Sequence, residues 1–580
     1  MNSRASFEWR KFAAWLLLGA PFFAYPLVWL KIFRSHVPHW GEVLCFAQPV
    51  LALFALAVLI CGGIGGLRCA CGHSKLHFAA VAASMLMVLL TLIRCALTRS
   101  IPDTTDLFMP LVPLAGMVIA KDVLHILPLY GTLSLAVLVF FGFRFTMFTG
   151  FVGNWNWNLS LIAVLIPAPF ILSKHPTHRR LWIGIGVSAL FLAVFSCCRP
   201  ELAPRGTIAG AAVAAGALWM LWKIPNRQRL VVVMLGGGAA LAMFLTVWLS
   251  PADSANRSSR LWLWRGSVEF VLTHSIYGVG TQGYEREINP YLPKEYYFSE
   301  FATDRHTHPH NELLSAWSAY GLAGALFFVL FVLAASQGLR TASPVRVWAW
   351  WLFVVLSVHG QFDVLLATPL AGTLWLVVGG ALAGRGYARR RPHLSSVMMA
   401  IAGGVILTLA LIFSGVLFSA TRLARLGICA TYNIDGEEKY NAREYFIRSL
   451  KIWPLPAVRY RLGMVEMFDF RNPEQAIKCF EELSPGYVHS NGYLARAYAF
   501  NDDLAKALLC FEEETLRYPY SALNAFWELE VMKRAGHPEN LLAPRRERVK
   551  YLLKLRGLTV ERIDELIRNP RLDDAPLRRP

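Results

Sequence analysis

The residues best suited to chemistry gather in one polar stretch, which runs from Arg257 to Gly324. It holds arginines, tryptophans, closely spaced glycines and the histidine-rich segment H-T-H-P-H-N. Arginine offers a planar fork that matches phosphate oxygens, and histidine exchanges a proton near neutral pH. Apolar runs flank the stretch on both sides, which suits it to chemistry on a charged, lipid-linked substrate.

The elements that must position these residues are long and apolar. Hydrophobic residues make up 55% of the 580-residue chain and charged residues only 16%, against about a quarter in ordinary soluble domains. Apolar runs of 18 or more residues recur through the first 420 positions, and each can cross the ~30 Å hydrocarbon core. We therefore expect an all-α, polytopic membrane helix bundle with about 12–13 spans. The predicted spans are residues 12–30, 42–61, 76–97, 107–120, 123–141, 155–172, 181–197, 206–222, 230–249, 311–335, 346–358, 364–383 and 395–418.

The net charge of +19 follows the pattern of membrane topology, since the Lys and Arg fall in loops between apolar runs. With a cytoplasmic N-terminus, the cytoplasmic loops hold 18 Lys and Arg and the short outer loops hold seven. Because basic residues favour the cytoplasmic side, this orientation is expected. It places residues 251–310, as one large loop, and residues 421–580 on the outer face. We expect no nucleic acid partner.

The tail, residues 421–580, reads as a second domain of charged, amphipathic helices. Small-then-aromatic positions recur near a period of 34 residues and resemble the tetratricopeptide repeat, whose usual role is protein binding. A generic helical bundle is the alternative. Cys479 and Cys510 occupy the same place in two repeats and are expected in the core, without a disulfide. The repeated A-x-x-x-F segments are Ala442–Phe446, Ala476–Phe480 and Ala507–Phe511.

The polar stretch resembles the signature region of the O-antigen ligase and O-antigen polymerase superfamily. The resemblance covers most of residues 76–385, and the ordered set of motifs is more specific than any one of them. Two upstream matches are Pro204-Arg205-Gly206, where the family typically has S-R-G, and the asparagine-rich Gly153–Asn156. The motifs of the stretch are Arg260 with Trp264, Gly278-Val279-Gly280 with Gly283-Tyr284, His308-Pro309-His310-Asn311 with Leu314, and Gly321 with Gly324.

The resemblance implies a GT-C-like membrane glycosyltransferase of the bacterial inner membrane, with the loop and the tail periplasmic. It would move a glycan from an undecaprenyl-diphosphate carrier to a hydroxyl of a glycolipid, glycan or protein acceptor, in contact with membrane lipids and with a protein partner on the repeats. O-antigen ligation is the favoured reaction. Repeat-unit polymerisation and protein O-oligosaccharide transfer are alternatives within the class. Polysaccharide transport or an assembly scaffold is the non-enzyme alternative.

The same resemblance assigns roles to residues at the outer ends of spans. Arg205 and Arg260 would stabilise the departing diphosphate, since helix N-termini and guanidinium groups both favour phosphate. His310 would take the proton of the acceptor hydroxyl, and Asn311 after it is a good N-cap. The residues expected to bind substrate are Arg199, Trp264, His308 and Asn311.

Alternatives remain for several of these roles. Arg199 competes with Arg205, and the earlier histidines His306 and His308, expected to be less firmly held, compete with His310. The tryptophans at 262 and 264 either stack on sugar rings or belong to a membrane aromatic belt. The residues His359, Gln361 and Asp363 could line the acceptor path. We expect no metal and no cofactor, although three alternating histidines could serve as metal ligands.

Overall fold

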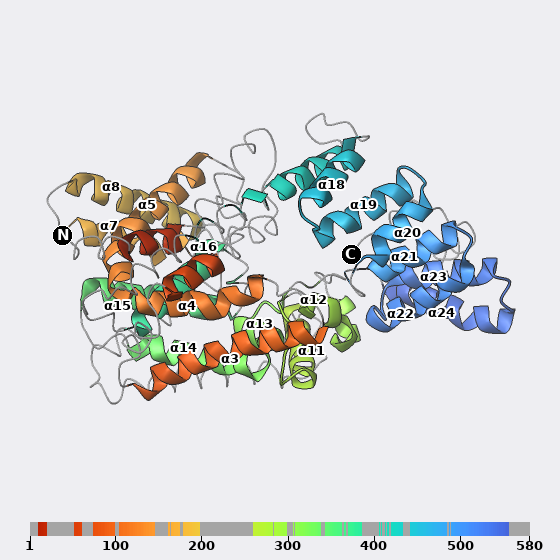
Figure 1. The fold of residues 1–580 in the computed structure, drawn as a ribbon, viewed down its shortest axis with the longest axis horizontal. Helices are drawn as coiled ribbons and strands as arrows, with labels where there is room; N and C mark the ends of the chain where they lie inside the picture. The colour runs from red at the N-terminus through yellow and green to blue at the C-terminus, as the bar shows by residue number, and fades with distance from the viewer. Residues whose placement is uncertain are drawn as a thin grey trace. The chain divides into compact units, whose positions relative to one another are not determined.

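A computed structural model of the chain shows only helices as regular elements in the part that it describes (Figure 1). The predicted all-α class is thus confirmed. Gaps of up to three residues lie inside some of the described ranges, and isolated positions are described between 405 and 416. The ranges are 10–19, 51–60, 74–98, 104–144, 161–173, 178–197, 259–298, 306–337, 343–384, 419–432 and 441–555.

The chain divides into two compact units. The bundle unit comprises residues 1–249, 274–281 and 310–415. The loop–tail unit comprises residues 250–273, 282–309 and 416–580. The polar loop was expected to belong with the spans, and most of it groups instead with the C-terminal tail.

Helix α16 is the central element of the bundle unit, since it packs against α4, α5, α14 and α15. Its residues from Leu370 to Ala383 are all buried. A helix that is apolar all round is typical of the middle of a bundle. The helices of this unit are α3 (Lys75–Thr98), η1 (Thr104–Leu107), α4 (Phe108–Val118), α5 (Ala120–Arg144), α7 (Pro167–Leu172), α8 (Arg179–Cys197), α13 (Glu312–Tyr320), α14 (Leu322–Ser336), α15 (Pro344–His359) and α16 (Pro369–Ala383).

Aromatic rings and small residues fix the neighbours of α16. Trp375 stacks on Phe353 of α15 with ring centroids 5.6 Å apart, and its indole N–H donates to Ser357 Oγ at 2.7 Å. On the opposite side, α16 and α4 approach closely at Gly380 and Gly116, where an added Cβ would meet backbone of the other helix. Close approach through glycine is the usual way in which membrane helices pack.

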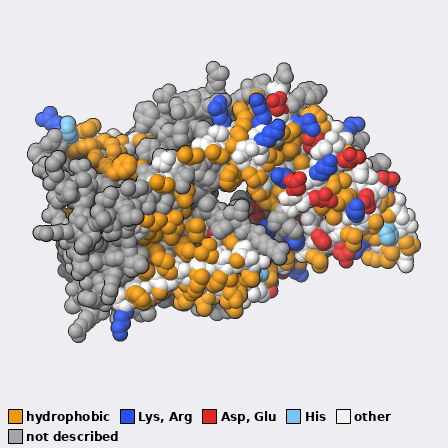
Figure 2. Space-filling view, viewed as in Figure 1, with side chains coloured by type: hydrophobic (Ala, Val, Ile, Leu, Met, Phe, Trp, Pro, Cys, Tyr) orange, Lys and Arg blue, Asp and Glu red, His pale blue; other side chains and the backbone are white. Residues whose placement is uncertain are grey.

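The described helices of the bundle unit expose many hydrophobic side chains, as contact with lipid would require. Helix α3 exposes hydrophobic side chains from Phe78 (68% exposed) to Leu97 (78% exposed). Figure 2 shows hydrophobic side chains over much of the described bundle surface and charges of both signs over the tail. Among the described helices, two are long and apolar enough to cross a membrane, Lys75–Leu97 and Ala120–Leu138, and five apolar helices are shorter.

The predicted span 311–335 is wrong in one respect, because two helices occupy it. The chain breaks between α13 and α14 at Gly321, which has φ of +64°. Glycine adopts this left-handed conformation without the steric cost that a Cβ carries. The break leaves α13 as a short, separate helix whose two ends are free to meet other segments.

The loop–tail unit contains a folded loop and a row of consecutive helices. In the tail, each helix from α18 to α24 packs against the next one along the chain. The alanine and phenylalanine of all three A-x-x-x-F segments are at most 3% exposed. Cys479 and Cys510 are half-buried and free, as predicted. The helices are α11 (Ser259–Thr273), α12 (Gly283–Glu287), η2 (Asn289–Tyr291), η3 (Lys294–Phe298), α18 (Asn441–Ile452), α19 (Pro456–Phe468), α20 (Pro473–Glu481), α21 (Ser490–Phe500), α22 (Leu504–Arg517), α23 (Ala522–Arg534) and α24 (Glu539–Leu555).

Candidate functional site

His310 lies directly before the N-terminus of α13, at a sharp turn of the chain. Its φ of +52° is left-handed, a conformation that is uncommon for a residue with a Cβ. The next residue, Asn311, is extended and caps the helix, because its Oδ1 accepts from the Leu314 N–H at 3.0 Å. The predicted N-cap is therefore confirmed. His310 is partly exposed, whereas Asn311 is buried.

A turn after α15 fixes this helix end. The Asn311 amide Nδ2 donates to the Gln361 carbonyl at 3.1 Å, and the Glu312 N–H donates to the Gly360 carbonyl at 2.9 Å. The carboxylate of Glu312 accepts from the Leu366 N–H at 2.8 Å. These three hydrogen bonds tie residues 360–366 to the residues that follow His310. Asp363, which was expected nearby, lies outside the described residues.

The Glu312 side chain was not recognised in the sequence and is only 1% exposed. An acidic residue in the first turn of an otherwise apolar helix is the signal that could have found it. A carboxylate there already interacts with the positive end of the helix dipole. This helix end is therefore less suited to a substrate phosphate than the sequence suggested.

The two glycine motifs meet at the other end of α13. The Val279 N–H donates to the Ser318 carbonyl at 2.8 Å, and the Gly280 N–H donates to the Ala319 carbonyl at 3.0 Å. A Cβ on Gly278 would lie 2.6 Å from Ala319 backbone atoms, and Gly278 also has a left-handed φ. Glycine is therefore required for both the turn and the close contact. The structure joins the G-V-G motif to the helix that begins after His310.

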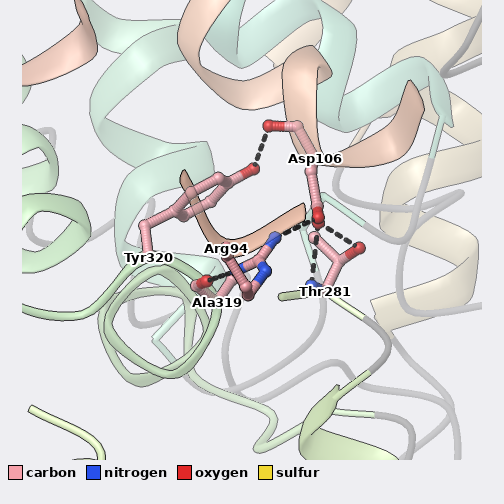
Figure 3. Close-up of polar contacts among 5 residues, drawn as sticks. All are labelled: Arg94, Asp106, Thr281, Ala319 and Tyr320. Carbon is pink, nitrogen blue, oxygen red and sulfur yellow. Dashed lines mark hydrogen bonds and ion pairs between the residues drawn. The ribbon is translucent and has the colours of Figure 1, made fainter. Parts of the chain in front are cut away.

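An ion pair locks this junction (Figure 3). Arg94 of α3 pairs with Asp106 of η1 and donates to the Ala319 carbonyl at 2.9 Å. Asp106 Oδ1 accepts from the Thr281 N–H at 2.9 Å and from its hydroxyl at 2.7 Å. The Tyr320 hydroxyl donates to the Asp106 carbonyl at 2.9 Å.

Asp106 is only 4% exposed, and a buried charge is tolerated when it is paired and hydrogen-bonded. Arg94 is one of the seven Lys and Arg counted from the sequence in the short outer loops. An ionisable residue at the end of an apolar span was the signal for its further role.

The loop that carries Arg260 has its own core, within the loop–tail unit. Arg260 lies in the first turn of α11 and is partly exposed, whereas Trp262 and Trp264 are each 7% exposed. Further along α11, Ser267 Oγ lies 2.6 Å from the hydroxyl of Tyr284, the tyrosine of the predicted G-Y motif. Burial raises the pKa of Tyr284 above its usual value. Contact of Trp264 with a sugar stays a prediction.

The three alternating histidines differ in their surroundings. His306 is 5% exposed, and its ring lies 4.8 Å from the ring of Tyr296, whose hydroxyl is 3.4 Å from His306 Nδ1. The ring of His306 is therefore more enclosed than that of His310, and the expectation that His306 is less firmly held stays a prediction. His308 is partly exposed.

The structure describes only some of the remaining predicted residues. Arg199 and Arg205 lie outside the described residues. His359, at the end of α15, is 2% exposed, next to the turn that holds Asn311. Across the described part of the chain, no three His, Cys, Asp or Glu side chains gather as a metal site would require. The absence of a metal from the reaction stays a prediction.

The apolar helix bundle with a polar site at helix ends has the features of an integral membrane protein of the all-α class. Residues 190–329 match the family model described as O-antigen ligase. This match confirms the resemblance read from the motifs of the segment. No curated protein matches the chain.

The match supports a general role for the chain. It supports a membrane enzyme of the glycosyltransferase type that acts as a ligase in polysaccharide assembly. The matched segment contains all seven residues predicted for the site, which are Arg199, Arg205, Arg260, Trp264, His308, His310 and Asn311.

Proposed function

We propose that the protein transfers a glycan from an undecaprenyl-diphosphate carrier to an acceptor hydroxyl, with ligation to a glycolipid as the favoured reaction. The observation that carries the proposal is the placement of His310. It sits in a left-handed turn before a capped helix, inside the segment that matches the O-antigen ligase family. Unusual backbone conformations that the surroundings hold in place are frequent at functional sites.

The proposed reaction needs a base and a stabilised leaving group. His310 takes the proton of the acceptor hydroxyl while the oxygen of that hydroxyl bonds to the anomeric carbon. The bond between that carbon and the diphosphate breaks, and the lipid diphosphate leaves with the electron pair. Arg205 and Arg260 stabilise its charge. Direct displacement inverts the anomeric configuration and uses no metal. The enzyme would act in the bacterial inner membrane, on its periplasmic face.

The test compares His310→Ala with His308→Ala in membranes. We expect His310→Ala to lose transfer by about two to four orders of magnitude, as removal of a general base does, and to keep donor binding, because the base acts on the acceptor. His308→Ala should retain more activity. The measurements are the surface-glycan profile of a complemented deletion strain and the retention of the lipid-diphosphate donor by purified protein.

Two results would contradict the proposal. Loss of transfer in His308→Ala together with normal transfer in His310→Ala would show that the proposal assigns the base to the wrong histidine. Inhibition of the wild-type enzyme by a chelator would show that the reaction needs a metal. Arg260→Ala is the companion variant for the donor side, with Arg260→Lys expected to restore only part of the activity, because lysine lacks the planar fork.

A further inference from the structure

The tail and the polar loop touch each other within the loop–tail unit. Tyr520, between α22 and α23, packs on Tyr297 of η3 with ring centroids 4.8 Å apart and planes tilted by 35°. Helix α22 also packs against η2 of the loop. The tail therefore provides part of the surface on which the loop folds.

A row of rings continues from this contact to the histidine segment. Tyr297 packs edge-on against Tyr296 at 5.5 Å, and Tyr296 packs edge-on against His306 at 4.8 Å. Both distances lie in the favoured range for aromatic pairs, roughly 4.5–7 Å. Tyr296 and His306 are 3% and 5% exposed, so the inner end of the row is enclosed.

Both sides of the row are fixed by hydrogen bonds. On the loop side, the Tyr297 hydroxyl donates to the carbonyl of Asn289 at 3.2 Å, and Asn289 is 1% exposed. On the tail side, the carbonyl of Pro519 accepts from Arg548 of α24 at 3.0 Å. Ser521 caps α23 by accepting from the Asn524 N–H at 3.4 Å. Tyr520 is thus held between two anchored neighbours.

We propose that the tail holds the histidine segment in place through the row Tyr520, Tyr297, Tyr296 and His306. Tyr520 and Tyr297 are then positioning residues for glycan transfer, although neither touches the substrate. His306 precedes His310 by four residues, so fixing its ring limits the motion of the chain that leads to the proposed base. The inference rests on the proposed function of His310, and it gives the tail a role in positioning the proposed base.

The test uses the full-length protein in detergent, with amide hydrogen exchange of residues 289–310 as the first readout. Tyr520→Ala should speed exchange there by about threefold to tenfold, because loss of an aromatic pair raises the population of the locally open state by about that factor. Tyr297→Ala, which alters the loop and leaves the tail intact, should do the same. Tyr520→Phe keeps the ring and should restore the wild-type rate.

The matched control is Tyr551→Ala on α24, whose side chain is 49% exposed. It removes a tyrosine from the same domain and should leave exchange of the loop unchanged. The second readout is the surface-glycan profile of a complemented deletion strain, in which Tyr520→Ala should lower transfer by about tenfold, because small displacements of a catalytic group are costly.

Three outcomes would overturn the inference. Unchanged exchange in residues 289–310 of Tyr520→Ala would show that the tail does not hold the loop. Faster exchange with a normal glycan profile would show that the contact has no role in transfer. Failure of Tyr520→Phe to restore either readout would exclude ring packing as the cause. Normal transfer in His310→Ala would instead refute the proposed base, and the exchange result would still report on the contact.

Discussion

At the scale of single residues, the environment of His310 combines strain with anchoring. A non-glycine residue in a left-handed conformation costs about 1–3 kcal/mol unless its neighbours offset it. Here the offset comes from Asn311, which uses its side-chain oxygen to cap α13 and its amide to hold Gln361. The side chain next to the proposed base therefore makes two separate connections, and they can be removed one at a time.

We predict that Asn311→Ala lowers the free energy of unfolding by about 1–2 kcal/mol, because it removes a helix cap and a buried hydrogen bond. Asn311→Ser keeps a capping oxygen and should recover much of the stability, but not the bond to Gln361 nor full transfer. The control is Ser343→Ala, which removes the exposed cap of α15. A thermal melt in detergent and the glycan profile measure both effects. Equal loss of transfer in Ser343→Ala would mean that general stability is the cause.

A second prediction at this scale concerns the tail cysteines. Burial raises the pKa of Cys479 and of Cys510 to about 11. At pH 8 only about one thiol in a thousand is therefore ionised, and thiolate is the form that reacts with alkylating agents. We expect iodoacetamide to label both cysteines slowly at pH 8 and quickly after denaturation.

The same shift has a consequence for stability, since the folded tail binds these protons more tightly than the unfolded chain. The contribution is complete below about pH 9, the usual range of a thiol, and is lost as the pH rises through about 11. Rapid labelling of the native protein at pH 8 would show that the Cys479 and Cys510 thiols are not shielded and protonated in the folded tail.

At the scale of elements, α13 is held at both ends by segments that are distant in sequence. The turn after α15 binds its N-terminus, and the G-V-G segment with the Arg94–Asp106 pair binds its C-terminus. The break at Gly321 makes this arrangement possible, because in a continuous helix the Ser318 and Ala319 carbonyls would accept from N–H groups four residues further on and would not be available to the G-V-G segment. The position of His310 is therefore set by the frame around a nine-residue helix.

We predict that Gly321→Ala is strongly destabilising. The alanine Cβ would clash with the Ile276 carbonyl, and the residue would keep a left-handed φ. A loss of about 3 kcal/mol or more is expected when backbone must shift. Gly184→Ala on α8 is the control, since an added Cβ there meets nothing within 4 Å. A melting temperature of Gly321→Ala equal to that of the control would refute the close contact.

At the scale of the whole molecule, the segments that make up the loop–tail unit bear on the membrane topology. The loop and the tail contact each other within one unit, which supports the prediction that both lie on the same side of the membrane. Independently, Lys and Arg are concentrated in the loops assigned to the cytoplasm, which favours the outer face for the loop and the tail. The two arguments use different evidence, one from packing and one from charge.

We predict that reporters fused after Pro251 and after Gly436 both read as periplasmic, whereas a fusion within residues 223–229 reads as cytoplasmic. A phosphatase that is active only outside the cytoplasm, paired with a fluorescent protein that is active only inside, measures the three positions. Opposite readings at Pro251 and Gly436 would contradict both the charge bias and the contact between the loop and the tail.

The sequence by itself determined the properties that local pattern controls. Long apolar runs predicted a helical membrane protein, the ordered motifs indicated the O-antigen ligase family, and Asn311 was recognised as a cap. The alanine and phenylalanine positions of the tail were expected in its core, and they are buried. Each of these depends on residues that are close in the chain or on composition.

Only the tertiary structure decided which distant residues meet. Arg94 and Ala319 are 225 positions apart, and their hydrogen bond follows from the packing of α3 beside α13 and α14. The break at Gly321 could not be recognised, because glycine is tolerated inside membrane helices and the segment that replaces the helical hydrogen bonds comes from residues 278–280. The contact of Tyr520 with Tyr297 likewise depends on long-range packing, which no local periodicity encodes.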